Sequence, residues 1–171
     1  MFSRRTFIAC SGLGAIALTA GVSSIISMKR TLLSDADAAE RFEVTHSDEE
    51  WRAILSAEQY QVLRREATER PYSSPLSDEH RDGIFACAGC DLALFSSTTK
   101  FDSHTGWPSF WAPLDAAVAS RQDRSMGFVR EEIHCRRCGG HLGHVFDDGP
   151  KPTGLRYCMN GLALTFKPKS A

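Results

Sequence analysis

Two Cys-x-x-Cys pairs constrain the fold of this chain more than any other feature. Cys87-Ala-Gly-Cys90 and Cys135-Arg-Arg-Cys138-Gly-Gly140 each place two thiols on one tight turn. Such a turn aims both thiolates at one metal ion, and two turns complete the four-thiolate tetrahedral site of structural zinc. Gly139, directly after the second pair, permits the positive φ that such a turn uses. We therefore predict one structural Zn²⁺ per chain, bound by Cys87, Cys90, Cys135 and Cys138.

Other uses of these cysteines stay open, because the segment between the pairs, residues 91–134, is longer than in a short zinc ribbon. The total of six cysteines is even, which permits disulfides in an exported chain. A redox Cys-x-x-Cys pair is expected near a βαβ unit, and the sequence predicts no such unit here. A zinc ribbon that only binds partners is a further alternative, with Arg136 and Arg137 at the tip of the second turn.

Short apolar runs punctuated by Gly, Asp and Pro predict a mainly β, antiparallel domain. We expect strands over residues 83–86, 92–95, 117–119, 126–130, 141–146 and 162–166. The segment Lys100–Trp111 carries four aromatic residues interrupted by Gly106 and Pro108, which fits neither a regular strand nor a helix. It either presents Trp107 to a ligand or packs as a loop over the core.

Two helices are predicted before the first strand. Ser47-Asp-Glu-Glu50 and Ser56-Ala-Glu-Gln59 match the capping box, in which a serine and the residue three positions later cap each other's backbone. Trp51 and Tyr60 follow these boxes and are expected in the core, with a ligand-binding platform as the alternative. We expect the exposed face of the second helix to carry Glu66, Glu69 and Arg70.

The first residues have the pattern of an export signal. Ser3-Arg-Arg-Thr-Phe-Ile8 is similar to the twin-arginine signal and leads into an uncharged apolar run that ends at Met28. We predict that residues 1–38 are an export leader and linker, that residues 47–168 form one domain, and that this domain is periplasmic. Retention of residues 8–28 as a membrane anchor is the alternative, because the run is about long enough to span a bilayer.

The overall charge argues against one broad class of partner. The chain has 20 Lys and Arg against 21 Asp and Glu, which gives a formal net charge of −1. Non-specific binding of nucleic acid needs a basic face, so we expect no nucleic-acid partner.

Cys158 is the one cysteine after the leader that lies outside a Cys-x-x-Cys pair. Residues 139–160 around it also include two histidines, two aspartates, an arginine and an asparagine. The thiolate is the reactive form of cysteine and a neighbouring imidazolium favours it, so Cys158 is a candidate nucleophile. An inert buried thiol is the alternative, and a peroxidase that uses the same thiol is another.

In combination these motifs resemble the B-type peptide methionine-R-sulfoxide reductases over residues 47–168. The matching pieces are Cys87-Ala-Gly-Cys, Thr99-Lys-Phe-Asp-Ser, Gly106-Trp-Pro-Ser-Phe, Cys135-Arg-Arg-Cys-Gly-Gly-His-Leu-Gly-His-Val-Phe, Asp148-Gly-Pro, Pro152-Thr-Gly and Arg156-Tyr-Cys-Met-Asn. The resemblance implies a tent-like fold of two small sheets. It also implies an oxidoreductase that reduces methionine-R-sulfoxide in peptides and proteins and is regenerated by a thioredoxin-like reductant.

The resemblance implies roles at single positions and the same zinc ligands. The implied catalytic residues are Cys158, His141, His144 and Asn160, and the implied substrate-binding residues are Trp107 and Arg156. Trp107 would pack its ring on the S-methyl group of the substrate. Arg156 lies two residues before Cys158, so on a strand both would share a face and the cation would lower the pKa of the thiol.

Two positions depart from the family pattern. Thr105 stands where many members carry a resolving cysteine, and His104 stands where glycine is usual. With four cysteines on zinc, no second thiol remains after the leader, so an external reductant would act directly on a Cys158 sulfenic acid. We expect a monomer whose only membrane contact is an uncleaved leader.

Overall fold

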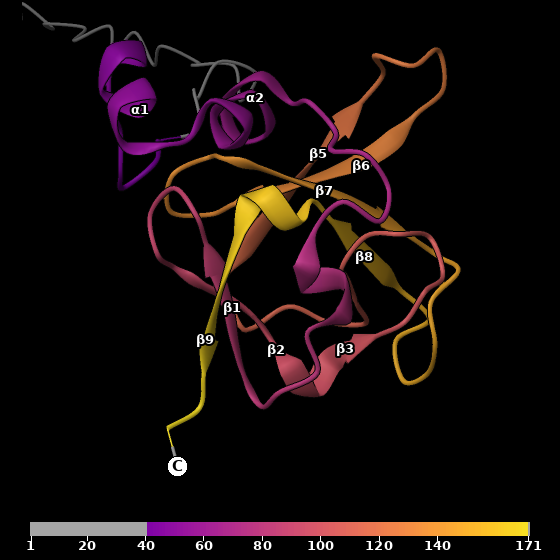
Figure 1. The fold of residues 1–171 in the computed structure, drawn as a ribbon. Helices are drawn as coiled ribbons and strands as arrows, with labels where there is room; N and C mark the ends of the chain where they lie inside the picture. The colour runs from indigo at the N-terminus through magenta and orange to yellow at the C-terminus, as the bar shows by residue number, and fades with distance from the viewer. Residues whose placement is uncertain (1–40, 171) are drawn as a thin grey trace, which may run out of the picture. The chain divides into compact units, whose positions relative to one another are not determined.

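The computed structural model describes residues 41–170, so the predicted leader with its alternative as an anchor lies outside the described residues. Within residues 41–170, no helix has the length and apolar character needed to cross a bilayer. The described residues form two helices, three short 3₁₀ turns and nine β-strands. Figure 1 shows their arrangement.

Helices α1 (Asp48–Ile54) and α2 (Ala57–Arg65) begin where the capping boxes predict. The Ser47 hydroxyl accepts the Glu50 N–H while the Glu50 carboxylate accepts the Ser47 N–H at 2.8 Å, and Ser56 and Gln59 repeat the arrangement. A serine cap contributes about 1 kcal/mol to helix stability. Trp51 is buried, as is Tyr60, so the prediction of core packing is confirmed.

The prediction that Glu66, Glu69 and Arg70 form the exposed face of the second helix is wrong, because all three lie beyond the end of α2; Glu66 and Arg70 are exposed, but Glu69 is buried. Helix α2 ends at Arg65 because Glu66 takes the left-handed conformation with φ of 57°, so helical spacing has no meaning beyond it. Glu69 therefore lies in the loop that follows, and it is only 7% exposed.

The strands form two antiparallel sheets, which confirms the predicted fold class. The smaller sheet has the order β2 (Ala93–Ser96), β1 (Gly83–Cys87), β9 (Leu164–Pro168). The larger sheet has the order β3 (Lys100–Phe101), β4 (Ser109–Phe110), β8 (Arg156–Met159), β7 (His141–Phe146), β6 (Arg130–Cys135), β5 (Val118–Asp123). The 3₁₀ turns are η1 (Pro75–Asp78), η2 (Ser97–Thr99) and η3 (Gly161–Ala163).

The strand predicted over residues 126–130 is wrong over 126–129, which belong to the turn between β5 and β6, and only Arg130 lies in a strand, as the first residue of β6. Phe128 and Val129 are 59% and 54% exposed, so their apolar side chains do not mark a buried strand face. The segment Lys100–Trp111 is mostly loop, as predicted, but it also contributes the two-residue strands β3 and β4.

Within the core, a cluster of aromatic side chains joins the two sheets. Phe110 of the larger sheet stacks on Phe95 of the smaller sheet with ring centroids 4.4 Å apart, and its ring meets Phe85 edge-on at 5.0 Å. All three are fully buried. Aromatic pairs at these separations add stability beyond the area they bury, so this cluster fixes one sheet against the other.

Candidate active site and metal centre

The two Cys-x-x-Cys pairs form matching turns. In the first, the Asp91 N–H donates to the Cys87 carbonyl at 2.8 Å, and in the second the Gly139 N–H donates to the Cys135 carbonyl at 2.8 Å. Asp91 and Gly139 follow the second cysteine of their pairs, and both have positive φ, 62° and 67°. The prediction of positive φ at Gly139 is confirmed. A Cβ atom there would also lie 2.4 Å from the Phe42 ring, so a larger residue at position 139 would have to displace this ring.

The four sulfur atoms of the two turns gather at one point and can hold a metal ion. All lie within 4.8 Å of one another, with Cys87 Sγ 3.7 Å from Cys138 Sγ and Cys90 Sγ 3.5 Å from Cys135 Sγ. Zinc–sulfur bonds of about 2.3 Å in a tetrahedron place neighbouring sulfurs about 3.8 Å apart. A disulfide would need about 2.05 Å. The cysteines are free thiols, so the arrangement fits a tetrahedral metal and not disulfides.

The two arginines at the tip of the second turn are used within the protein. Arg137 Nη1 donates to the Cys90 carbonyl at 3.3 Å, which links the second turn to the first. Arg136 Nε donates to the Ala116 carbonyl at 2.6 Å. These contacts tie both side chains to the fold, which weakens the interpretation of the turn as a binding module.

Cys158 lies in a row of polar residues that crosses the larger sheet. Directly paired positions run from Arg121 on β5 through Glu132, His144 and Cys158 to Ser109 on β4. Paired residues of antiparallel strands place their side chains on the same face, with Cβ atoms about 4.5–5.5 Å apart. Strand register, and not sequence proximity, therefore brings His144 beside Cys158.

Close approach of two strands at this point depends on Gly143. A Cβ atom at position 143 would lie 2.1 Å from the Cys158 carbonyl oxygen. Any other residue would push β7 away from β8, and the pairing of His144 with Cys158 would be lost.

The Cys158 thiol opens into a cavity of about 130 Å³. Its lining residues are Thr68, Trp107, Arg130, Gly143, His144, Phe146, Cys158 and Asn160. We call this the Cys158 cavity. Sites for drug-sized ligands span about 300–1,000 Å³, so this one suits the tip of a single side chain. Four of the predicted site residues meet here: Cys158, His144, Asn160 and Trp107.

His144 is oriented by a carboxylate. Its Nε2 lies 2.8 Å from Oδ2 of Asp123, which also accepts from Nη2 of Arg130 at 2.6 Å. Hydrogen bonds from Ser125 and from His144 hold the pKa of Asp123 far below its usual value, so the carboxylate can only accept. The hydrogen of the neutral imidazole is then on Nε2. Burial lowers the pKa of His144, so at neutral pH the ring is uncharged and Nδ1 can accept a proton.

His141 occupies a different place. It is 2% exposed and does not line the Cys158 cavity. Its Nδ1 lies 2.7 Å from Oε1 of Glu132, which Arg121 holds in turn, and its ring packs against the His144 ring at 5.4 Å. The two histidines therefore differ in position. His144 lines the cavity with the Cys158 thiol, and His141 lies outside the cavity and packs against the His144 ring.

The sequence predicts that Arg156 binds substrate and lowers the pKa of Cys158. Its guanidinium makes two 2.8 Å hydrogen bonds to Asp148, lies 4.4 Å from the centre of the Phe146 ring, and does not line the cavity. The Arg156 charge does act to lower the pKa of the thiol, but burial acts more strongly in the opposite direction. The net result is that the pKa of Cys158 is raised.

Two hydroxyl groups contact the sulfur, and a third links them. Thr105 Oγ1 lies 3.9 Å from Cys158 Sγ, and Ser103 Oγ lies 2.8 Å from Thr105 Oγ1 and 2.7 Å from Ser109 Oγ. The hydroxyls of Thr105 and Ser109 favour the thiolate and so lower the pKa of Cys158, against the larger effect of burial.

We expect the rate of Cys158 alkylation by iodoacetamide to be low at neutral pH and to rise as the pH is raised. The midpoint of this rise should lie above the pKa of a free cysteine, about 8.5. The thiolate is the reacting form, and burial disfavours it. Replacing Thr105 by Val should move the midpoint upward, because one stabilising hydroxyl is lost. Replacing exposed Thr165 by Val is the matched control and should leave the midpoint unchanged. A midpoint near 7 in the unmodified protein would contradict this assignment.

His104 adopts the left-handed conformation with φ of 55°, which explains why glycine is usual there. Its side chain is 85% exposed, and its carbonyl accepts the Tyr72 hydroxyl at 2.8 Å. It thus belongs to the loop and lies outside the cavity.

Pattern reasoning missed Thr68, Arg130 and Phe146 in the cavity, and Asp123 behind it. Each lies on a different element, and only pairing across the sheet brings Asp123 and Arg130 to His144. The sequence feature that could have indicated Asp123 and Arg130 is a turn between two strands, with one of these residues on each strand.

Comparison with known proteins agrees with this geometry. The SelR domain family matches residues 55–168. A peptide methionine sulfoxide reductase MsrB from Pseudomonas putida (strain W619) is 56% identical over 122 residues, 71% of this chain and 92% of the relative. A protein of the same name from Thiobacillus denitrificans is 55% identical over 124 residues, which are 72% of this chain and 94% of the relative. Another from Agrobacterium fabrum is 52% identical over 126 residues, which are 73% of this chain and 93% of the relative.

Proposed function

The chain belongs to the SelR family of B-type peptide methionine sulfoxide reductases, and on that premise we propose that it reduces methionine-R-sulfoxide in peptides and proteins through a sulfenic acid on Cys158. Family membership makes it an oxidoreductase. The observation that carries the proposal is the Cys158 cavity, where a thiol, an indole, an imidazole and a carboxamide meet in a space sized for one side-chain tip.

The reaction transfers one oxygen atom from substrate sulfur to enzyme sulfur. The Cys158 thiolate attacks the sulfoxide sulfur and forms a sulfur–sulfur bond. The protonated oxygen then passes to the Cys158 sulfur as the sulfur–sulfur bond and the sulfur–oxygen bond of the substrate break, which leaves methionine and a sulfenic acid on Cys158. Methionine gains two electrons and Cys158 loses two. Trp107 supplies an apolar, π-rich wall for the S-methyl group, which carries partial positive charge as the sulfur is activated.

The proton that the oxygen needs comes from the thiol itself. His144 accepts it on Nδ1, and the resulting imidazolium, stabilised by Asp123, donates it to the oxygen as the sulfur–oxygen bond breaks. No external acid is consumed in this step. This assigns proton transfer to His144 and a supporting role to His141.

Regeneration requires an external dithiol. The reductant, which we propose is thioredoxin-like, gives two electrons to the sulfenic acid, water leaves, and the Cys158 thiol is restored. Thr105 supports direct reduction because it occupies the position beside Cys158 from which a cysteine could form a disulfide.

Replacing Thr105 by Cys should convert the enzyme to an intramolecular disulfide mechanism. Thr105 Oγ1 is 3.9 Å from Cys158 Sγ, so small side-chain rotations would bring two sulfurs to bonding distance of about 2.05 Å. After one turnover without reductant, mass spectrometry should find a disulfide between the introduced thiol and Cys158 in the variant, and a trappable sulfenic acid in the unmodified protein. A disulfide that involves a Cys-x-x-Cys pair in either protein would contradict the scheme.

We propose that the metal is one zinc ion with a structural role. Four thiolates fill a tetrahedral site and leave no position for substrate, and zinc bound in this way stabilises the fold. Cys87, Cys90, Cys135 and Cys138 would hold it.

The test of the proposed function is consumption of the two methionine sulfoxide epimers, with dithiothreitol as reductant and chiral separation of the remainder. Loss of the R epimer alone is expected. Loss of neither epimer from folded, metal-loaded protein would overturn the proposal. Reduction of hydrogen peroxide without any action on sulfoxide would instead favour a thiol peroxidase.

We further propose that the protein is exported through the twin-arginine route and acts as a monomer in the periplasm. The support is the Arg4-Arg5 pair before the apolar run. Replacing both arginines by Lys should keep the full-length chain in the cytoplasm on cell fractionation, and unchanged export would overturn the proposal.

A further inference from the structure

Glu69 is a buried carboxylate close to the Cys158 cavity, and the mechanism above does not use it. It is 7% exposed, and among the described residues no lysine, arginine or histidine forms an ion pair with it. Burying a charge without a cation is costly unless hydrogen bonds replace the lost water. The contacts that replace the lost water therefore indicate what the carboxylate does.

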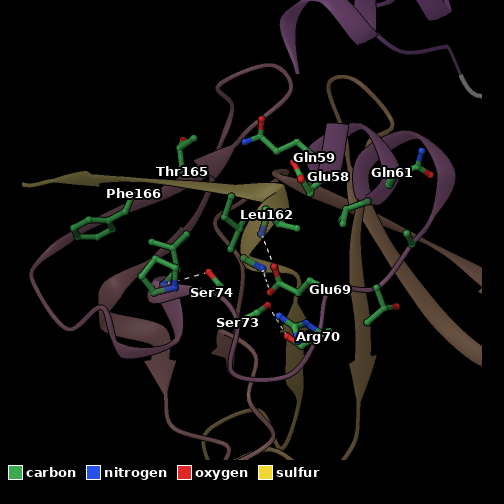
Figure 2. A pocket seen from close by; sticks show the side chains of 17 residues that line it. Glu58, Gln59, Gln61, Glu69, Arg70, Ser73, Ser74, Leu162, Thr165 and Phe166 are labelled. Carbon is green, nitrogen blue, oxygen red and sulfur yellow. Dashed lines mark hydrogen bonds between the residues drawn. The ribbon is translucent and has the colours of Figure 1, made fainter. Parts of the chain in front are cut away.

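Both carboxylate oxygens accept backbone N–H groups of the η3 turn. The Gly161 N–H donates to Oε1 at 2.6 Å and the Leu162 N–H donates to Oε2 at 2.9 Å. Figure 2 shows the Glu69 carboxylate directed at this turn, which leads from β8 into β9. The turn starts two residues after Met159, so the carboxylate clamps the chain close to the end of the strand that carries Cys158.

The backbone of the same residue contacts two side chains of the Cys158 cavity. The Glu69 N–H donates to Oδ1 of Asn160 at 3.0 Å, and its carbonyl accepts Nε1 of Trp107 at 3.2 Å. Asn160 Nδ2 also donates to the Leu142 carbonyl, so the orientation of its amide is set from both ends. One residue thus holds the indole, the carboxamide and the turn next to the nucleophile.

Glu69 lies in the wall between two hollows. A groove of about 820 Å³ lies beside α2 and is lined by Glu58, Glu69 and Leu162 among others, whose side chains are drawn in Figure 2. The Cys158 cavity lies on the other side, and Thr68 lines both. The wall segment is a loop that is tied by backbone hydrogen bonds at Ala67 and Tyr72, and between these two points the Glu69 contacts hold it to the Cys158 cavity and the η3 turn.

We propose that Glu69 is a positioning residue that sets Trp107 and Asn160 for the reaction by anchoring the wall of the Cys158 cavity to the η3 turn. The inference rests on the proposed function. We expect loss of the Glu69 contacts to lower the rate of the chemical step, because a misplacement of about 1 Å in a positioned group can cost about 100-fold in rate.

The test compares Glu69→Gln with Glu58→Gln, which makes the same chemical change on the same groove but touches neither Trp107 nor Asn160. Glutamine offers one acceptor oxygen and turns an NH₂ donor toward a backbone N–H, so one anchor is lost. Glu69→Gln should lower kcat/KM for methionine-R-sulfoxide at least about 10-fold, and most of the loss should be in kcat. Rates are measured well below the melting temperature and expressed per Cys158 thiol determined by titration. Glu58→Gln should match the unmodified protein.

A spectroscopic signal separates positioning from a merely structural role. The Trp107 indole contacts the backbone of residue 69 and not the replaced side chain, so its N–H resonance should shift in Glu69→Gln only if the carboxylate positions that carbonyl. The Trp51 resonance should stay in place. A lower melting temperature with unchanged kcat and an unchanged Trp107 resonance would overturn the proposal.

Glu69→Asp keeps the charge and guards against a failure of Glu69→Gln to fold. Its carboxylate is one methylene shorter and cannot reach both N–H groups, so kcat should fall and the Trp107 resonance should shift. Wild-type kcat in Glu69→Asp would overturn the proposal. If the unmodified protein reduces neither epimer, the proposed function fails, and the Trp107 resonance alone then tests the anchor.

Discussion

Replacing Cys158 by Ser should lower reduction of methionine-R-sulfoxide at least about 10³-fold, as expected when a nucleophile is removed. A serine hydroxyl is a far weaker nucleophile than a thiolate and cannot accept the substrate oxygen as a sulfenic acid. The measurement is consumption of the R epimer with excess dithiothreitol, together with sulfenic acid trapping after one turnover.

The same variant should keep its metal and its melting temperature. Cys158 is not one of the four clustered thiols, and serine is close to cysteine in size. Turnover near that of the unmodified protein would remove Cys158 as the nucleophile. Loss of turnover together with loss of metal would show a folding defect and would leave the chemical assignment without support.

Replacing Cys135 by Ser should release the metal and lower the melting temperature by at least about 10 °C. Structural zinc contributes about 10–16 kcal/mol of apparent binding free energy in small domains, and about 1 kcal/mol corresponds to about 2–4 °C in a chain of this size. Cys135 is fully buried, so serine would also leave an unpaired hydroxyl in the core.

Metal content by elemental analysis and unfolding by calorimetry measure this effect. Cys158→Ser is the matched control, because the same substitution is made outside the cluster. A Cys135→Ser protein that is metal-free, stable and active would contradict the structural role of the site.

Residue types at short spacing made the metal site and the helix starts predictable. The capping boxes at Ser47 and Ser56 and the positive φ of Gly139 each follow from a few consecutive residues, and the structure confirms all three. Local interactions of this kind do not depend on the rest of the fold.

What sequence reasoning missed depends on contacts between distant residues. Helical spacing extended past the left-handed Glu66 places Glu69 on an exposed face, whereas its burial comes from the η3 turn about ninety residues later. The apolar Phe128 and Val129 gave a false strand signal. His141 and His144 have the same local pattern, and only the pairing of β7 with β6 and β8 separates their surroundings.

The metal turns lie on different sheets, since Cys87 ends β1 of the smaller sheet and Cys135 ends β6 of the larger one. The four-thiolate site is complete only when the sheets have docked, so we expect metal capture to be a late event in folding. Conversely, a bound ion leaves only when the sheets separate. Its release rate into a chelator should therefore report the rate of global unfolding and should be insensitive to chelator concentration once the chelator is in excess.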